Sequence, residues 1–503
     1  MAEPIIFDEK KKTDKKQLTI APGSRLDGHV KIEIFLDDKG DVDETYFQVV
    51  ELRGFEEFCK GRPVEEMPRI TTALCGICPW AHHLASTKAL DMMFDVTPPK
   101  AALMAREAAY CAHQVHSHVS HFYALAAPDF VLGPAAPVEK RNVVGLIEAV
   151  GVELGKEVLH TRVLAQKIQE RIGGRATHPV HGLPGGNSKP LTKEDQAWIL
   201  EQSKTFVGFA QKSLQIFNDI VLANKTYLDI ITNKDLYCHD SYHMGLVDEN
   251  NHMNFYDGKV RVVDQKGKEF AKFDAAHYLD EIAEQPLPWS YLKFPYLRKV
   301  GWKGLVDGPD SGLARAACLS RLNVSEGMAT PLANAEWDRY MSTLGGTPVQ
   351  FTLATHWARL VETLYAAERL KELVENNDIL DPHVRNIPTT NKGEGMGIVE
   401  APRGTLIHHY RSDENGMVTT VNLIVATAFN HGAICIDTDK VARGLIKNGE
   451  VSPGIFNMIE MVFRCYDPCF SCATHSLPGQ MPMQIELIKR DGSKEVIKRN
   501  ELE

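Results

Sequence analysis

The sequence predicts a mainly α fold with small β elements (α+β): one large helical-bundle domain with an N-terminal β-hairpin and a β-rich excursion. Long segments with apolar residues at helical spacing fill the middle of the chain. An alternating apolar–polar stretch lies near the N-terminus. No internal repeat or low-complexity linker divides the 503 residues, so one interlocked domain is favoured over separate modules.

Composition narrows the class of protein. The chain is 44% hydrophobic and 24% charged, which is ordinary for a globular protein. A net charge of −10 and the lack of a basic stripe argue against a nucleic acid partner. No stretch reaches the length of a membrane span, and residues 1–17 read as a lysine-rich flexible tail without an apolar signal core. We therefore expect a cytoplasmic protein, in which clustered cysteines favour metal binding over disulfides.

The first ordered element is expected to be a hairpin. Val30, Ile32, Ile34 and Leu36 alternate with mostly polar residues, and residues 37–40 supply the turn before a return strand. A charged group, residues 24–29, precedes this half-buried strand.

Three helical segments are expected in the first half of the chain, at residues 100–125, 142–171 and 196–224. The first begins after a capping Thr and two prolines at 97–99. It carries four histidines, which could suggest a metal-binding face: His113, His116, His118 and His121. Because no Cys or carboxylate partner stands among these four histidines, we interpret the segment as a buried helix with hydrogen-bonded histidines.

The second half mixes strands and helices. Residues 235–310 combine short strands, turns and aromatic residues, and predict the β-rich excursion. Helices are expected at 312–332 and 349–376, and a strand at 421–426. The glycine-rich loop at 173–186 lacks the spacing of a phosphate or dinucleotide cradle.

Two Cys-x-x-Cys pairs stand near opposite ends of the chain, Cys75 with Cys78 and Cys469 with Cys472. Thiolates are soft ligands that select zinc, copper, nickel or iron. We expect the pairs to meet and hold one metal centre. A structural four-cysteine zinc site is an alternative, although its pairs usually lie about 15 to 20 residues apart. A thiol–disulfide redox pair is another, but neither pair has thioredoxin-like surroundings.

The flanking residues add a resemblance. Arg53-Gly-Phe-Glu56 before the first pair, and Asp467-Pro-Cys469-x-x-Cys472-x-x-His475 at the second, resemble the two signature motifs of the large (catalytic) subunit of nickel–iron hydrogenases. The resemblance spans most of residues 18–475 and is weaker at 235–310. The chain looks most like the cytosolic multi-subunit group, of the viologen-reducing or bidirectional type.

The resemblance implies reversible, heterolytic cleavage of dihydrogen. Cys75 and Cys469 would bind nickel terminally, and Cys78 and Cys472 would bridge nickel to an iron carrying carbon monoxide and cyanide. Arg403, in Ala-Pro-Arg-Gly, would overhang the open position, where a permanently charged guanidinium can polarise dihydrogen or orient a base. A surface salt bridge is the plainer interpretation of this arginine.

Supporting roles follow from the same resemblance. Thr427 would donate to an iron-bound cyanide, and His82 would orient a bridging thiolate. Glu56, the Leu423 carbonyl and His475 would hold a magnesium ion.

Three positions depart from the family. Asp27 stands where Glu more often relays protons from the terminal cysteine, which leaves a gap for a water molecule or requires a backbone shift. Ala73 replaces a common Arg or Lys, and Ser117 replaces a common Asp. Neither replacement removes a ligand, but both could change the electrostatics of the site.

The remaining cysteines are scattered and form no ferredoxin-like run, so we expect no iron–sulfur cluster or flavin on this chain: Cys59, Cys111, Cys238, Cys318, Cys435 and Cys465. An iron–sulfur small subunit must then carry electrons away, with further electron-transfer subunits behind it. Residues 476–503 read as a hairpin around Asp491-Gly492. By resemblance they form an extension removed by a maturation protease after nickel-insertion proteins load the site; a permanent surface hairpin is the alternative.

Two other functions stay open at this point. One is the large subunit of respiratory quinone oxidoreductases, which shares the fold but lacks the nickel ligands. The other is a non-catalytic protein with structural zinc. Intact cysteine pairs at both ends favour the hydrogenase.

Overall fold

The computed structural model describes residues 7–474, 484–488 and 493–498. His475 and most of the expected C-terminal extension lie outside the described residues, so the domain boundaries expected at 17 and 475 stay predictions. Within 476–503, strands β17 (Gln484–Ile488) and β18 (Lys494–Lys498) pair antiparallel, which confirms the expected hairpin.

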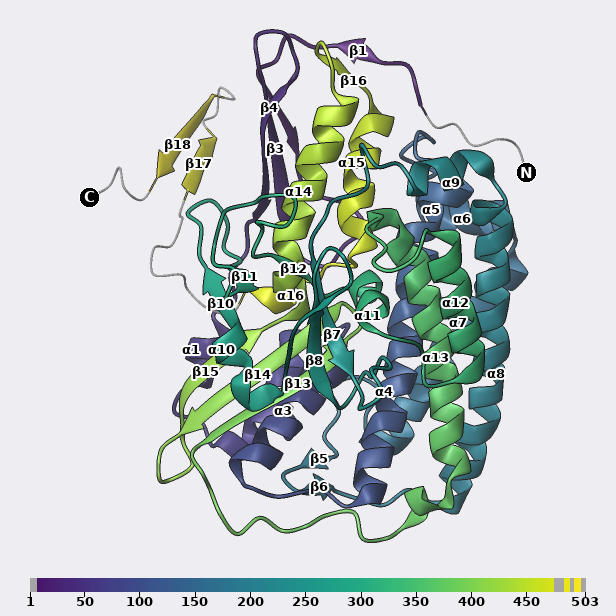
Figure 1. The fold of residues 1–503 in the computed structure, drawn as a ribbon, viewed down its shortest axis with the longest axis vertical. Helices are drawn as coiled ribbons and strands as arrows, with labels where there is room; N and C mark the ends of the chain where they lie inside the picture. The colour runs from purple at the N-terminus through teal and green to yellow at the C-terminus, as the bar shows by residue number, and fades with distance from the viewer. Residues whose placement is uncertain (1–6, 475–483, 489–492, 499–503) are drawn as a thin grey trace.

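Four long helices stand side by side and form the helical body (Figure 1). They are α4 (Lys100–Ser120), α7 (Val152–Gly173), α8 (Lys193–Phe217) and α13 (Thr355–Glu375). Helix α13 packs against both α4 and α8, and α4 also packs against α7. Most of α4 and α13 is buried because apolar and small side chains face neighbours on several sides.

The N-terminal sheet has the order β2–β3–β4, formed by Gln17–Ile20, Val30–Leu36 and Val42–Val49. The alternating residues of β3 are buried on one face, as the sequence predicts. Helix α14 (Ala426–Leu445) packs against β4. The sheet therefore connects the N-terminal strands to the C-terminal part of the chain.

A second antiparallel sheet packs against helix α3 (Pro79–Met93) and consists of β13 (Glu394–Ala401), β14 (Gly404–Ser412) and β15 (Val418–Ile424). Two glycines in β13, Gly395 and Gly397, face the helix. A Cβ atom at either position would collide with a backbone carbonyl of α3, so only glycine permits this close packing.

The β-rich excursion is confirmed. One sheet has the order β12–β7–β8–β9, from Ala314–Arg315, Tyr242–Val247, Lys259–Val263 and Glu269–Phe273. Strands β10 (Ile282–Gln285) and β11 (Phe294–Leu297) form a separate pair.

Several expected helix boundaries are wrong. Residues 312–332 are not one helix: β12 pairs parallel with β7, α11 covers only Cys318–Val324, and α12 (Pro331–Thr343) begins with a proline in its first turn. The segment 142–171 breaks at Gly151, whose φ of 92° separates α6 (Val143–Val150) from α7.

Shorter elements complete the described fold. Helices α4 and α8 continue as the π-helical turns η3 (His121–Ala126) and η4 (Asn218–Leu222). The others are α1 (Phe55–Cys59), η1 (Val64–Glu66), α2 (Met67–Ile70), η2 (Thr71–Leu74), α5 (Ala127–Val131), α9 (Lys225–Ile231), η5 (Ala275–His277), α10 (Tyr278–Glu281), η6 (Thr352–Ala354), η7 (Asn377–Leu380), α15 (Pro453–Cys465), α16 (Phe470–Ala473), β1 (Lys11–Lys12), β16 (Glu450–Val451), β5 (Gly182–Leu183) and β6 (Gly186–Asn187). In the described part of the chain, every helix is too short or too polar to cross a membrane.

Candidate metal centre

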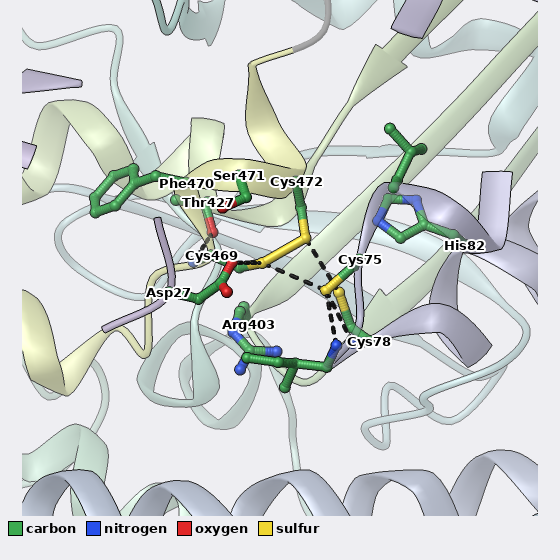
Figure 2. The surroundings of a disulfide bond; sticks show 12 residues. Asp27, Cys75, Cys78, His82, Arg403, Thr427, Cys469, Phe470, Ser471 and Cys472 are labelled. Carbon is green, nitrogen blue, oxygen red and sulfur yellow. Dashed lines mark hydrogen bonds between the residues drawn. A yellow bond between two sulfur atoms is a disulfide. The ribbon is translucent and has the colours of Figure 1, made fainter. Parts of the chain in front are cut away.

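The two cysteine pairs meet in the core, as the sequence predicts (Figure 2). Cys75 follows η2, Cys78 precedes α3, and Cys469 and Cys472 bracket the start of α16. All four sulfur atoms lie within 4.8 Å of one another, and the four residues are at most 4% exposed. Cys469 and Cys472 are joined as a disulfide, whereas a metal ion requires both as thiolates. The metal-binding form is therefore the reduced one.

Backbone contacts shape both cysteine loops. The N–H groups of Ile77 and Cys78 donate to the sulfur of Cys75 at 3.2 and 3.0 Å. Arg53 donates to the carbonyls of Leu74 and Ala73, and its own N–H donates to the Thr474 carbonyl. Arg53 thus links the first cysteine loop to the end of the second.

The first pair is arranged to hold one thiolate. Burial acts to raise the pKa of Cys75, but the hydrogen bond from Cys78 and the charge of Arg403 outweigh it and lower that pKa. The pKa of Cys78 lies well above its usual value, because its proton is held by the hydrogen bond to Cys75 and because the site is buried. A soft cation would release this proton and engage both sulfur atoms.

Arg403 lies beside the four sulfur atoms (Figure 2). Its Nη2 donates to Asp467 Oδ1 at 3.1 Å, and the two side chains are only 4% and 2% exposed. Burial acts to lower the pKa of Arg403, but the charges of Asp467, Cys78 and Cys75 raise it above its usual value. Its Nε and Nη1 have no partner among the described residues. The surface salt bridge interpretation is therefore wrong: this is a buried, charged group with free donors.

Asp27 reaches the second pair directly. Its Oδ2 lies 2.9 Å from Cys469 Sγ, a hydrogen-bonding distance once that sulfur is a thiol. The backbones of the two segments also bond, because Asp27 N–H donates to Pro468 and Phe470 N–H donates to Asp27. This pairing brings the shorter aspartate into contact, so no bridging water is needed.

Thr427 and His82 lie beside the cysteines (Figure 2). Thr427 Oγ1 accepts a hydrogen bond from Cys469 N–H at 3.0 Å, which leaves its hydroxyl proton available. His82 Nδ1 lies 3.0 Å from His408 Nε2, and His82 Nε2 has no partner in the described chain. Burial lowers the pKa of His82 to about 3, so its ring is neutral.

The expected magnesium ligands are partly described. Glu56 Oε1 accepts a hydrogen bond from Leu423 N–H at 2.8 Å. Both residues line a small pocket that also contains Glu284, Lys293 and Ala473. His475 lies outside the described residues, although Ala473 is close to it in sequence.

Three of the four expected histidines are buried, His113, His118 and His121, whereas His116 is half-buried. An acidic group and a sulfur atom lie close to His118. His118 Nε2 lies 3.0 Å from Glu362 Oε2, and Cys318 completes a set with metal-binding spacing. The guanidinium of Arg321 already bonds both Glu362 oxygens and the Cys318 sulfur. A cationic side chain therefore occupies the place of a second metal ion.

The sequence motifs contain Arg53 and Asp467, but their contacts were not predicted: Arg53 bonds to the first cysteine loop and Asp467 pairs with Arg403. Ser117 Oγ, where a change in the electrostatics of the site was expected, is buried without a partner in the described chain. The pairing of Asp467 with Arg403 could have been predicted, since Asp467 is a charged residue two positions before a metal-ligating cysteine and the overhanging arginine needs a counter-ion.

The comparisons with known proteins agree with this geometry. A family model described as nickel-dependent hydrogenase matches residues 53–142 and 228–475. The chain belongs to the nickel-dependent hydrogenases. A second model, described as HoxL-like, matches residues 17–52.

Relatives cover almost the whole hydrogenase chain. An F420-non-reducing hydrogenase protein from Archaeoglobus profundus, whose name calls it an iron–sulfur subunit, is 45% identical over 95% of this chain and 98% of its own length. The HoxS subunit beta of a NAD-reducing hydrogenase from Cupriavidus necator is 36% identical over 95% and 98%. The crystal structure of a NAD⁺-reducing [NiFe]-hydrogenase has a TM-score of 0.86 at 33% identity, covering 92% of this chain and all of that one. This chain is thus the large subunit of a nickel–iron hydrogenase, and its four cysteines bind the nickel–iron centre. The zinc and quinone oxidoreductase alternatives are rejected.

Proposed function

We propose that this hydrogenase subunit splits dihydrogen reversibly and heterolytically, with Arg403 and Asp27 as its acid–base and orienting groups. The observation that carries the proposal is the convergence of four buried sulfur atoms, a buried charged guanidinium and a carboxylate 2.9 Å from a cysteine sulfur. When bound, the nickel–iron centre supplies a soft, electron-rich pair of metals at which dihydrogen is cleaved.

The protein groups divide the remaining work. Cys469 Sγ receives the released proton, and Asp27 Oδ2 takes it onward, because that oxygen is already within hydrogen-bond reach. Arg403 stays charged and fixed by Asp467, so its free Nε and Nη1 can orient dihydrogen in a site shielded from water.

We further propose that the iron carries carbon monoxide and cyanide ligands. The Thr427 hydroxyl is available to donate to one cyanide, since its oxygen only accepts from the Cys469 backbone. The unpartnered Nε2 of the neutral His82 is available to orient a bridging sulfur. Magnesium would bind Glu56, the Leu423 carbonyl and His475, in a pocket that already gathers two of these residues.

Electrons need a partner protein, which we propose is an iron–sulfur small subunit. Ala73 and Gly76 are exposed although the neighbouring Cys75 is buried, so the first cysteine loop reaches the surface. A cluster-bearing partner docked on this loop would approach the metal centre closely. Further electron-transfer subunits would follow in a cytoplasmic complex; the eight unpaired cysteines suit a reducing compartment.

We also propose that residues 476–503 are removed by a maturation protease after nickel-insertion proteins have loaded the site. Mass spectrometry of the active enzyme should find a chain that ends at His475. An active chain still ending at Glu503 would reject the cleavage.

Infrared spectroscopy of the anaerobically purified complex tests the main proposal. Bands of metal-bound carbon monoxide and cyanide should appear and shift under dihydrogen. Fully processed, nickel-loaded protein without such bands would refute the proposed ligands, and bands that ignore dihydrogen would refute the reaction.

A further inference from the structure

A buried arginine outside the metal centre contacts the backbone that carries Arg403. Arg321, in α11, is fully buried, and its guanidinium donates to both oxygens of Glu362 at 2.7 and 2.6 Å. It also donates to Glu400 Oε2 at 3.1 Å, to the Ala401 carbonyl at 2.8 Å and to the Pro402 carbonyl at 3.1 Å. One side chain therefore binds two carboxyl groups and two successive carbonyls.

The two carbonyls belong to the tight turn between β13 and β14. Ala401 pairs with Gly404 across the turn, so Pro402 and Arg403 alone form its tip. The other side of the turn is also held, because Asn430 Nδ2 donates to the Arg403 carbonyl at 2.9 Å. With both sides bonded, the turn has little freedom to shift relative to the cysteines.

The charges around Arg321 favour a specific role over generic packing. A buried guanidinium is costly unless its charge is matched, and apolar residues of similar size often stabilise a core as well or better. Here Glu362 supplies the match, and His118 Nε2 lies 3.0 Å from the same carboxylate. The fork geometry of the guanidinium lets it bond Glu362 and the turn carbonyls at once, which the single ammonium of lysine cannot do.

We propose that Arg321 is a positioning residue for the hydrogenase reaction: it fixes the Pro402–Arg403 turn, and thereby the Arg403 guanidinium, over the metal centre. The proposal rests on the proposed role of Arg403. The hydrogen bonds of Arg321 go to Glu362, Glu400, Cys318 and the turn carbonyls and to none of the four metal-binding cysteines, so it acts through the turn. A displacement of about 1 Å at the reacting groups can cost about a hundredfold in rate.

A double-mutant cycle tests this in the purified complex. Arg321→Lys should lower kcat for dihydrogen oxidation about tenfold to a hundredfold. Arg403→Lys alone should cost about a hundredfold or more. Combined with Arg403→Lys, the Arg321 change should cost less than about twofold further, because the group that it positions is already lost.

Backbone hydrogen exchange provides a readout that is independent of turnover. Arg321→Lys should speed exchange at the backbone N–H groups within residues 401–405, where only Pro402 has none. Arg106→Lys is the matched control: Arg106 is also fully buried, and it pairs with Asp91 and donates to the carbonyls of Leu183 and Gly186. This control should leave exchange at 401–405 and kcat unchanged.

The results of the cycle distinguish the positioning role of Arg321 from the proposed role of Arg403. If the losses from Arg321→Lys and Arg403→Lys multiply, or if Arg321→Lys keeps full kcat, the positioning proposal is wrong although the role of Arg403 stands. If Arg403→Lys keeps full kcat, the role of Arg403 falls first and the positioning proposal with it. Should Arg321→Lys fail to accumulate, Glu362→Gln loosens the same guanidinium and enters the same cycle with the same expected results.

Discussion

Replacing Asp467 by asparagine keeps the shape of the side chain but removes the counter-ion of Arg403. The pair joins Nη2 and Oδ1 at 3.1 Å, and almost nothing of either side chain reaches solvent. The arginine would then keep its charge in a buried site, since a guanidinium stays protonated in proteins.

The expected cost follows from this burial. Removing one partner of a buried ion pair costs about 3 to 5 kcal/mol, because the other charge is left uncompensated. Asp27 and the thiolate forms of Cys75 and Cys78 also attract Arg403, so its charge is not left wholly uncompensated. We therefore expect a loss of about 3 kcal/mol at pH 7.

Urea unfolding of the purified complex, followed by circular dichroism, measures this loss. Asp439→Asn is the control, because Asp439 pairs with Arg443 at 2.7 Å in an i,i+4 geometry with both side chains partly exposed. That change should cost only about 0.3 to 0.5 kcal/mol. A loss for Asp467→Asn within about 1 kcal/mol of the control would contradict the expected uncompensated charge.

Three further predictions concern the proton relay, the metal ligands and a buried acid. Asp27→Asn should slow hydrogen–deuterium exchange of the gas about a hundredfold or more, whereas Asp27→Glu should retain it. Cys472→Ser should abolish nickel binding in elemental analysis, whereas Cys435→Ser, at a buried thiol outside the centre, should retain it. Burial raises the pKa of Glu400 to about 7 from its usual 4.5, so the folded chain binds the extra proton between these values. The free energy of unfolding should therefore fall as pH rises through this window, and Glu400→Gln should remove that part of the slope; an unchanged slope would exclude Glu400 as its source.

Local patterns predicted the elements with strong periodicity. The alternation from Val30 to Leu36 gave the strand and its buried face, because side chains in a strand point to opposite sides in turn. The prediction of one helix at 312–332 was wrong because the apolar residues of this segment are divided between a strand paired with β7 and two helices. That pairing depends on residues about seventy positions away, which a local pattern does not contain.

The candidate site divides in the same way. The two Cys-x-x-Cys pairs, with the family resemblance of their flanks, were sufficient to predict the four cysteine ligands, since each motif is local. The buried bonds around them were not predicted: Arg321 meets Glu362 and Glu400, and His82 meets His408, across long stretches of chain. Nothing in the sequence near either partner specifies such contacts, because packing of whole elements brings the partners together.

The two glycines of β13, Gly395 and Gly397, fix how closely this strand packs against α3. They let α3 rest directly on the strand, and α3 begins next to Cys78 while β13 ends two residues before Arg403. The contact between α3 and β13 therefore sets the distance between a metal ligand at the start of the helix and the arginine just after the strand. An added methyl group at Gly397 would push α3 and β13 apart, because it would collide with the Ala85 carbonyl oxygen. The absence of a side chain at this position therefore preserves the placement of Arg403 relative to Cys78.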